Sequence, residues 1–88
     1  SFNQPIGNWD VSNVTDMRDM FRLSGFNQNI SNWSVGNVTE MSGMFIYTDF
    51  FNQNLSSWDV VGVTSCSSFS YEALAWTLPK PNFTNCTP

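Results

Sequence analysis

The most constraining feature of this chain is a short block that occurs three times. Residues 2–15 read FNQPIGNWDVSNVT, and related blocks begin at Phe26 and again at Phe51. A unit this short cannot bury its own apolar face, so neighbouring units must stack to form a core. We therefore expect a fold of stacked repeats and a function that depends on surfaces.

We expect the 88 residues to form a single domain that is built from similar repeats. We assign residues 1–75 to three repeats, at 2–25, 26–50 and 51–75, and residues 76–88 to a degenerate half-repeat. Trp76 and Phe83 stand one repeat length after Phe51 and Trp58, so aromatic residues persist where the FNQ signature is lost. Because an altered last unit covers the apolar end of a repeat array, we expect residues 76–88 to form a C-terminal cap.

The apolar positions of one unit predict its local structure. In the first repeat they are Ile6, Trp9, Val11, Val14, Met17, Met20 and Phe21. The first four have the spacing of a leucine-rich repeat, with a very short strand around Trp9 and Val11. The last three fall at positions i, i+3 and i+4 and follow Thr15, which predicts one or two helical turns with a threonine N-cap.

Composition and charge exclude several partners. The net charge is −4 and the basic residues are Arg18, Arg22 and Lys80, too few to neutralise nucleic acid or to bind anionic lipid. No apolar run approaches the roughly 18 residues of a membrane-spanning helix, so we expect no membrane insertion. Charged residues make up 11% of the chain, unusually few for a cytosolic domain. The chain begins at Ser1 within the repeat pattern, so we expect it to be the mature or C-terminal part of something longer.

Catalytic and metal-binding residues are scarce. The chain has no histidine, which removes the commonest general base and metal ligand. Asp10 and Asp59 occupy one repeat position and are candidates for a calcium ladder, but Ser34 stands at that position in the second repeat. A solvated column of polar residues explains the pattern better. We therefore expect no enzyme activity, no cofactor and no metal site.

The two cysteines, Cys66 and Cys86, both lie near the C-terminal end. An even count in a chain poor in charge and rich in Asn, Ser and Thr favours a disulfide over two buried thiols. Such a bond would pin the tail onto the third repeat.

Glycosylation sequons are the most specific chemical signal. The triplet N-x-[S/T] occurs at Asn13, Asn29, Asn32, Asn37, Asn54, Asn82 and Asn85. If the protein comes from a eukaryotic secretory pathway, we expect several of these residues to carry N-linked glycans. In a bacterium, the same triplets would be the turn chemistry of the repeat.

The column Trp9, Trp33 and Trp58 allows either a carbohydrate-stacking surface or a core. We favour the core, because each Trp stands at the inward position of its repeat. Phe2, Phe26 and Phe51 should fold back into the core as well. The outward positions form a candidate contact face of Asn8, Asp10, Ser12, Asn32, Ser34 and Asp59.

The pattern FNQ–(N/P)–I–xx–W–(D/S)–V–xNVT–(D/E)–M–xx–MF resembles the BspA-type leucine-rich-repeat surface proteins, including a mycoplasma-lipoprotein-type repeat domain of unknown function. The first two repeats match over nearly their whole length, and the third matches as far as Val63 and Thr64. The resemblance implies a right-handed leucine-rich-repeat-like α/β solenoid, with very short parallel strands, short helical turns and a period of about 24–25 positions. It also implies an extracellular or cell-surface location, and it transfers no catalytic residue.

Two functions remain open at this point. The first is a structural or adhesive module of a surface glycoprotein, which assembles into a layer or fibre with neighbouring repeats or protomers. The second is a recognition module that binds a protein or glycan through the short-strand face.

Overall fold

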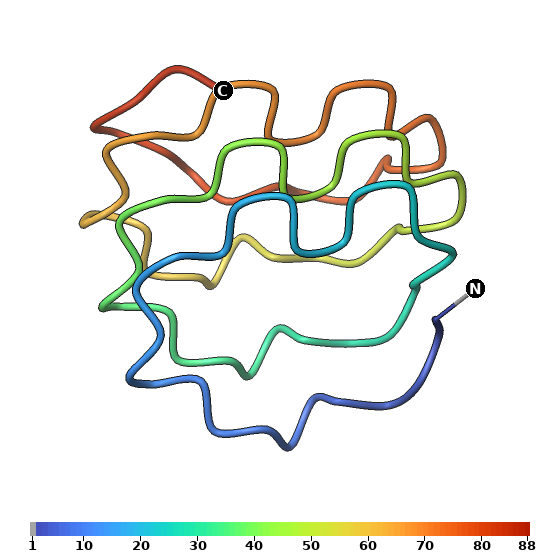
Figure 1. Ribbon diagram of the computed structural model, residues 1–88, viewed down its shortest axis with the longest axis horizontal. Coiled ribbons are helices and arrows are strands. Elements are labelled where there is room, and N and C mark those ends of the chain that lie inside the picture. Colours follow the sequence, from blue (N-terminus) through green and yellow to red (C-terminus); the bar gives the residue numbers. More distant parts are fainter. Residues whose placement is uncertain (1) are drawn as a thin grey trace.

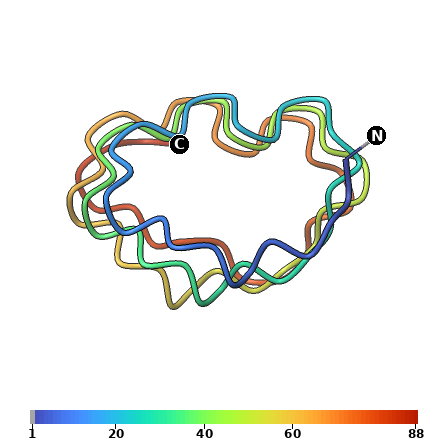
Figure 2. The ribbon, with the colours of Figure 1, turned by 60° about the horizontal axis from the view of Figure 1, so that its bottom comes forward.

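The computed structural model describes residues 2–88. The chain winds in successive coils that lie one above another (Figure 1). Seen from the second direction, the coils superimpose as an oval ring (Figure 2). We call residues 2–25 coil 1, 26–50 coil 2, 51–75 coil 3 and 76–88 the tail. The whole body measures 29 × 27 × 19 Å, with a radius of gyration of 11.6 Å.

The prediction of a right-handed, leucine-rich-repeat-like α/β solenoid is wrong. Residues 2–88 contain no helix, and strand pairing is limited to the isolated parallel bridges Asp16↔Glu40 and Glu40↔Ser65. Turns, bends and irregular backbone make up the rest of the described chain. The molecule is a small compact globule of stacked turns that carries a disulfide.

The expected helical turns fail because backbone N–H groups alternate between two kinds of partner. We call residues 16–24, 40–48 and 65–73 the turn segments. The Met44 N–H donates within its own coil, to the Met41 carbonyl three residues earlier at 3.3 Å. The next N–H, on Phe45, donates to the Phe69 carbonyl of coil 3 at 2.9 Å. An α-helix needs consecutive bonds to the residue four positions back, so this alternation excludes it.

Left-handed residues reinforce the alternation. Each turn segment contains two residues of positive φ, four positions apart: Asp19 and Leu23, Gly43 and Tyr47, Ser68 and Glu72. A right-handed helix cannot include such a residue without breaking. Only Gly43 lacks a Cβ atom, so the other positions carry little sequence signal for this conformation. The spacing of Met17, Met20 and Phe21 therefore suggested a helix that the backbone does not form.

The other side of each coil is held by side chains. We call residues 2–15, 26–39, 51–64 and 76–88 the motif segments. The Asn27 N–H donates to Asn3 Oδ1 at 2.9 Å, the Asn52 N–H to Asn27 Oδ1 at 2.9 Å, and the Thr77 N–H to Asn52 Oδ1 at 2.9 Å. The FNQ signature thus encodes a ladder of amide side chains between coils, each accepting from the backbone of the next coil.

The threonine expected to cap a helix also bonds between coils. Thr39 donates to the Thr15 carbonyl through its N–H at 2.9 Å and through Oγ1 at 3.3 Å. The Thr64 N–H continues the series to the Thr39 carbonyl at 3.0 Å. The N-cap interpretation is therefore wrong, because there is no helix within residues 2–88 for these threonines to cap.

Apolar side chains fill the inside of the ring as columns of equivalent residues. Phe26 and Phe51 stack with ring centroids 6.0 Å apart, and Trp33 and Trp58 stack at 6.5 Å. On the turn side, the rings of Phe21 and Phe45 lie 5.4 Å apart. Burial of these columns, which no single coil could achieve alone, provides the main driving force for the stack.

Candidate functional site

The coil 1 end of the stack is an open face. Phe2 is 46% exposed and Trp9 is 54% exposed, whereas the equivalent Trp33 and Trp58 are each 4% exposed. The Trp33 indole N–H donates to the Ile6 carbonyl of the preceding coil at 3.0 Å. The Trp9 indole has no such acceptor within residues 2–88. The predictions that Trp9 and Phe2 belong to the core are therefore wrong, because no coil within residues 2–88 covers either of them.

The same face presents backbone groups that inner coils use for stacking. In coil 2, four carbonyls of the turn segment accept N–H groups from coil 1, at 2.8–3.1 Å. The equivalent coil 1 carbonyls accept no hydrogen bond within residues 2–88; they belong to Asp16, Arg18, Met20 and Arg22. We call this surface, with Phe2 and Trp9, the coil 1 face.

The opposite end is partly covered by the tail. The Trp76 indole donates to the Gln53 carbonyl at 3.0 Å, and the Leu55 N–H donates to the Pro79 carbonyl at 2.9 Å. Phe83 packs edge-on against Phe69 with ring centroids 4.9 Å apart. These hydrogen bonds join the tail to the motif segment of coil 3, so the tail adds half a layer to the stack.

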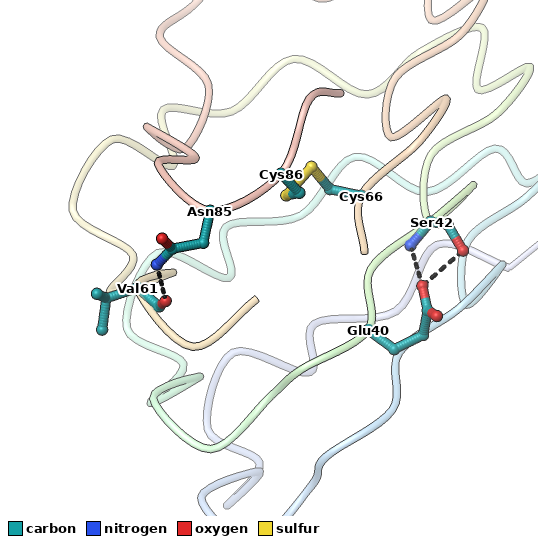
Figure 3. Close-up of a disulfide and its surroundings, with 6 residues drawn as sticks. All are labelled: Glu40, Ser42, Val61, Cys66, Asn85 and Cys86. Atoms are coloured by element: carbon teal, nitrogen blue, oxygen red, sulfur yellow. Dashed lines mark hydrogen bonds between the residues drawn. A yellow bond between two sulfur atoms is a disulfide. The ribbon is translucent and has the colours of Figure 1, made fainter. Parts of the chain in front are cut away.

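A disulfide fixes the end of this tail. Cys66 and Cys86 are bonded, as the even cysteine count predicted, with their Cα atoms 5.9 Å apart (Figure 3). Beside the bond, Asn85 Nδ2 donates to the Val61 carbonyl at 2.6 Å (Figure 3). In the chain-entropy account, a cross-link spanning 20 residues stabilises the fold by about 3 kcal/mol.

Within residues 2–88, the tail covers the turn segment of coil 3 only at its start, where Cys66 is buried beside Cys86. The N–H groups that would donate to a further coil find no partner within residues 2–88; they belong to Cys66, Ser68, Ser70 and Glu72. A shallow pocket lies along this edge, lined by Ser68, Phe69, Ser70, Tyr71 and Pro88. We call the four N–H groups and the pocket the coil 3 edge.

Acidic side chains close small turns on the surface. Glu40 Oε1 accepts the Ser42 hydroxyl at 2.6 Å and the Ser42 N–H at 2.9 Å, and these bonds lower the pKa of Glu40 (Figure 3). The hydroxyl and N–H of Ser12 lower the pKa of Asp10 in the same way. The Arg18 N–H lowers the pKa of Asp16, with a smaller contribution from the Arg18 guanidinium. These carboxylates stabilise local turns, and none of them lines the pocket at the coil 3 edge.

All seven sequon asparagines are exposed, but several of them stabilise the coils. Asn29 Oδ1 and Asn54 Oδ1 accept the N–H groups of Ser31 and Ser56, which closes an Asx turn in each coil. The amides of Asn37 and Asn85 donate to carbonyls of the neighbouring coil. No side-chain hydrogen bond within residues 2–88 involves the remaining three, Asn13, Asn32 and Asn82. Glycosylation stays a prediction at all seven positions.

The candidate contact face lies on the outside of the motif segments. Its residues are exposed, apart from half-buried Ser12; they are Asn8, Asp10, Ser12, Asn32, Ser34 and Asp59. Asp59 Oδ1 accepts the Val61 N–H at 3.2 Å, so this carboxylate also closes a turn. Across residues 2–88, no group of three or more His, Cys, Asp or Glu side chains is placed to hold a metal ion.

The comparison with protein families identifies the chain. The family described as "Mycoplasma protein of unknown function, DUF285" matches residues 1–84. The chain belongs to this family. Searches of curated proteins and of solved structures found no match.

Membership of DUF285 extends over all three coils and most of the tail. It assigns no activity, since the family's function is unknown. No helix within residues 2–88 has the length and apolar character needed to cross a membrane. The structure adds two features that the repeat pattern does not predict. Within residues 2–88, the coil 1 end has carbonyls without a donor, and the coil 3 end has N–H groups without an acceptor.

Proposed function

We propose that this DUF285 chain is a non-enzymatic module of an extracellular or cell-surface protein, with a structural or adhesive role. The observation that carries the proposal is the coil 1 face, where Phe2 and Trp9 are exposed although their counterparts in coils 2 and 3 are buried. An exposed aromatic face of this kind marks an interaction surface.

The occupant that fits the coil 1 face is a further coil with the same repeat pattern. The two internal junctions, between coils 1 and 2 and between coils 2 and 3, both contain the four turn-segment N–H bonds and the tryptophan indole bond at equivalent positions. A further coil would supply a carbonyl to the Trp9 indole and N–H groups to the carbonyls at Asp16, Arg18, Met20 and Arg22. Such a junction extends a stack, which is how a structural module lengthens.

Two further observations support a location outside the cytosol. The Cys66–Cys86 disulfide is of the kind that persists in oxidising compartments. The resemblance of the repeat pattern to BspA-type surface proteins points the same way. The absence of histidine supports the non-enzymatic part of the proposal.

Protease treatment of intact native cells tests the location. We expect the module to be digested while a cytosolic marker remains intact; protection of the module until the cells are lysed would contradict a surface role. Intact mass before and after glycosidase treatment would then show whether any of the seven sequons carries a glycan.

A fused coil tests the proposed junction. A copy of residues 26–50 placed directly before Phe2 should bury Trp9 and shift its fluorescence to shorter wavelength. A fusion that carries the same segment in scrambled order is the control. Equal Trp9 fluorescence in the two fusions would contradict the junction.

The second candidate function is recognition of a protein or glycan through the contact face. The outward side chains of Asn8, Asn32 and Ser34 favour it, because they are exposed and make no hydrogen bond within residues 2–88. Loss of surface binding on the double change Asp10→Ala and Asp59→Ala would support this role. Unchanged binding would favour the coil 1 face instead.

A further inference from the structure

An exposed apolar patch lies on the side of the stack, away from both of its ends. The segments 22–25, 46–50 and 71–75 lie one above another where the turn segments end, at the right-hand edge of Figure 1 and again in Figure 2. They carry five large apolar side chains that are 43–76% exposed: Leu23, Tyr47, Phe50, Tyr71 and Leu74. We call these five side chains the lateral patch. Because all three coils contribute to it, its exposure does not depend on a layer before coil 1 or after coil 3, and a grouped apolar surface of this kind marks an interaction site.

Backbone hydrogen bonds hold the patch in place. The Leu23 N–H donates to the Ile46 carbonyl at 2.8 Å, and the Tyr47 N–H donates to the Tyr71 carbonyl at 2.9 Å. The rings of Tyr47 and Tyr71 also pack edge-on, with centroids 5.7 Å apart. The surface is thus preformed, which lowers the entropic cost of binding a partner.

Charges of opposite sign flank the patch along the stack. Leu23, Tyr47 and Glu72 hold the same left-handed position in coils 1, 2 and 3. Arg22 precedes Leu23, so this side of the stack is basic at coil 1 and acidic, through Glu72, at coil 3. Both charged side chains are exposed, and neither forms an ion pair within residues 2–88. A partner with the reverse order of charges would complement this side of the molecule.

We propose that the lateral patch binds a second copy of this chain, related to the first by a two-fold axis beside Tyr47 and perpendicular to the stack. This axis sets coil 1 of each copy opposite coil 3 of the other, so Arg22 meets the partner's Glu72 at two symmetric places. The two Tyr47 rings lie at the centre, where buried aromatic residues contribute most to binding. The two Asp49 side chains lie on opposite flanks of the axis, so the pairing does not bring them together. A pairing of parallel stacks would instead place Arg22 against Arg22, which charge repulsion disfavours.

This inference goes beyond the end-to-end junction proposed above. A further coil on the coil 1 face would lengthen one stack, whereas the lateral patch would join two stacks side by side. The two surfaces share no side chain, so either proposal can fail without the other.

Charge reversal tests the two-fold arrangement. The intact, oxidised 88-residue chain is studied by sedimentation equilibrium up to about 1 mM, where we expect a monomer–dimer equilibrium. Arg22→Glu or Glu72→Arg alone places like charges at both symmetric contacts and should raise the dissociation constant at least about tenfold. An equimolar mixture of the two variants should dimerise about as tightly as the unchanged chain, because one variant is acidic and the other basic at both positions. Recovery in the mixture would also show that both variants are folded.

Three further variants locate the contact. Tyr47→Asn introduces a residue suited to the left-handed backbone and should weaken the dimer at least about tenfold. Val61→Thr alters a similarly exposed apolar side chain outside the patch, and Trp9→Ala alters the coil 1 face; both should leave dimerisation unchanged. A chain that stays monomeric at about 1 mM would overturn the proposal and leave the patch to a partner of another kind, such as a glycan. Loss of the dimer on Trp9→Ala, or a mixture that dimerises no better than its components, would overturn it as well.

Discussion

The two ends of the stack differ although both are made from the same repeat. At the coil 1 end, Phe2 and Trp9 are exposed, and alternate turn-segment carbonyls, from Asp16 to Arg22, accept no hydrogen bond within residues 2–88. At the coil 3 end, Trp76 of the tail is buried, its indole pairs with the Gln53 carbonyl, and a disulfide holds the tail in place. A residue of the repeat is therefore core or surface according to whether another layer covers it, and its local sequence does not decide this.

The largest expected effect comes from comparing tryptophans along the stack. Trp58→Ala removes a ring that is 4% exposed and stacks on Trp33, and it removes the bond to the Ile30 carbonyl. We expect a loss of about 3–5 kcal/mol in the free energy of unfolding. Trp9→Ala is the matched control and should cost about 1 kcal/mol or less, since its ring is half exposed. Urea unfolding gives both values; equal costs would mean that Trp9 is also core.

The second-largest expected effect is a loss of stability on removal of the disulfide, at the end of the stack that the tail covers. The double change Cys66→Ala and Cys86→Ala is expected to cost about 3 kcal/mol, from the chain entropy regained over 20 residues. Hydrogen exchange should show where the effect lies. Faster exchange at the Leu55 and Thr77 N–H groups, with little change in coil 1, would place it in the tail. A uniform increase over all coils would show that the tail stabilises the whole stack cooperatively.

The change Gly7→Ala adds one methyl group and tests how closely the motif segments of coils 1 and 2 approach each other. A Cβ atom on Gly7 would lie 2.6 Å from the Asn29 carbonyl oxygen, which is backbone and cannot move alone. We expect Gly7→Ala to cost about 1–3 kcal/mol. Gly36→Ala is the control, because its Cβ would meet only the Asp59 carboxylate at 3.8 Å, and it should change stability by about 0.5 kcal/mol or less. Thermal unfolding of the two variants distinguishes these cases.

The smallest expected effect is a pH dependence shared by the surface turns. The folded state lowers the pKa values of Asp10, Asp16 and Glu40 from ordinary values of 3.8 for Asp and 4.5 for Glu. Their ionised forms thus stabilise the folded state above these values, and this contribution disappears as the pH falls through the lowered pKa values. Stability should decline below about pH 4. The triple change Asp10→Asn, Asp16→Asn and Glu40→Gln should flatten the decline; an unchanged profile would assign it to other carboxylates.

Much of the structure could be predicted from the sequence where a signal recurs. The repeat identified the stacked positions, so the burial of Phe26, Phe51, Trp33 and Trp58 followed, and the paired cysteines indicated the disulfide. The burial of Trp9 and Phe2 was predicted wrongly, because burial in a repeat depends on the neighbouring layer.

The turn segments could not be predicted in the same way. Met17, Met20 and Phe21 have helical spacing, but the backbone alternates its N–H partners between coils, and only the stack as a whole selects that arrangement. Left-handed φ at Leu23, Tyr47 and Glu72 has no residue-type signal. The donor and acceptor edges at the two ends follow from this alternation, so the sequence could not reveal them.

Amide hydrogen exchange on the free 88-residue chain tests the central claim most directly. If alternate N–H groups of each turn segment join the coils, the amides of Met41, Gly43, Phe45 and Tyr47 should exchange slowly. Their coil 3 counterparts at Ser68, Ser70 and Glu72 should exchange at least about tenfold faster, because nothing within residues 2–88 accepts from them and none of the three is buried. Equal protection of both sets, or continuous protection of every amide from residue 41 to 48 as in a helix, would contradict this account.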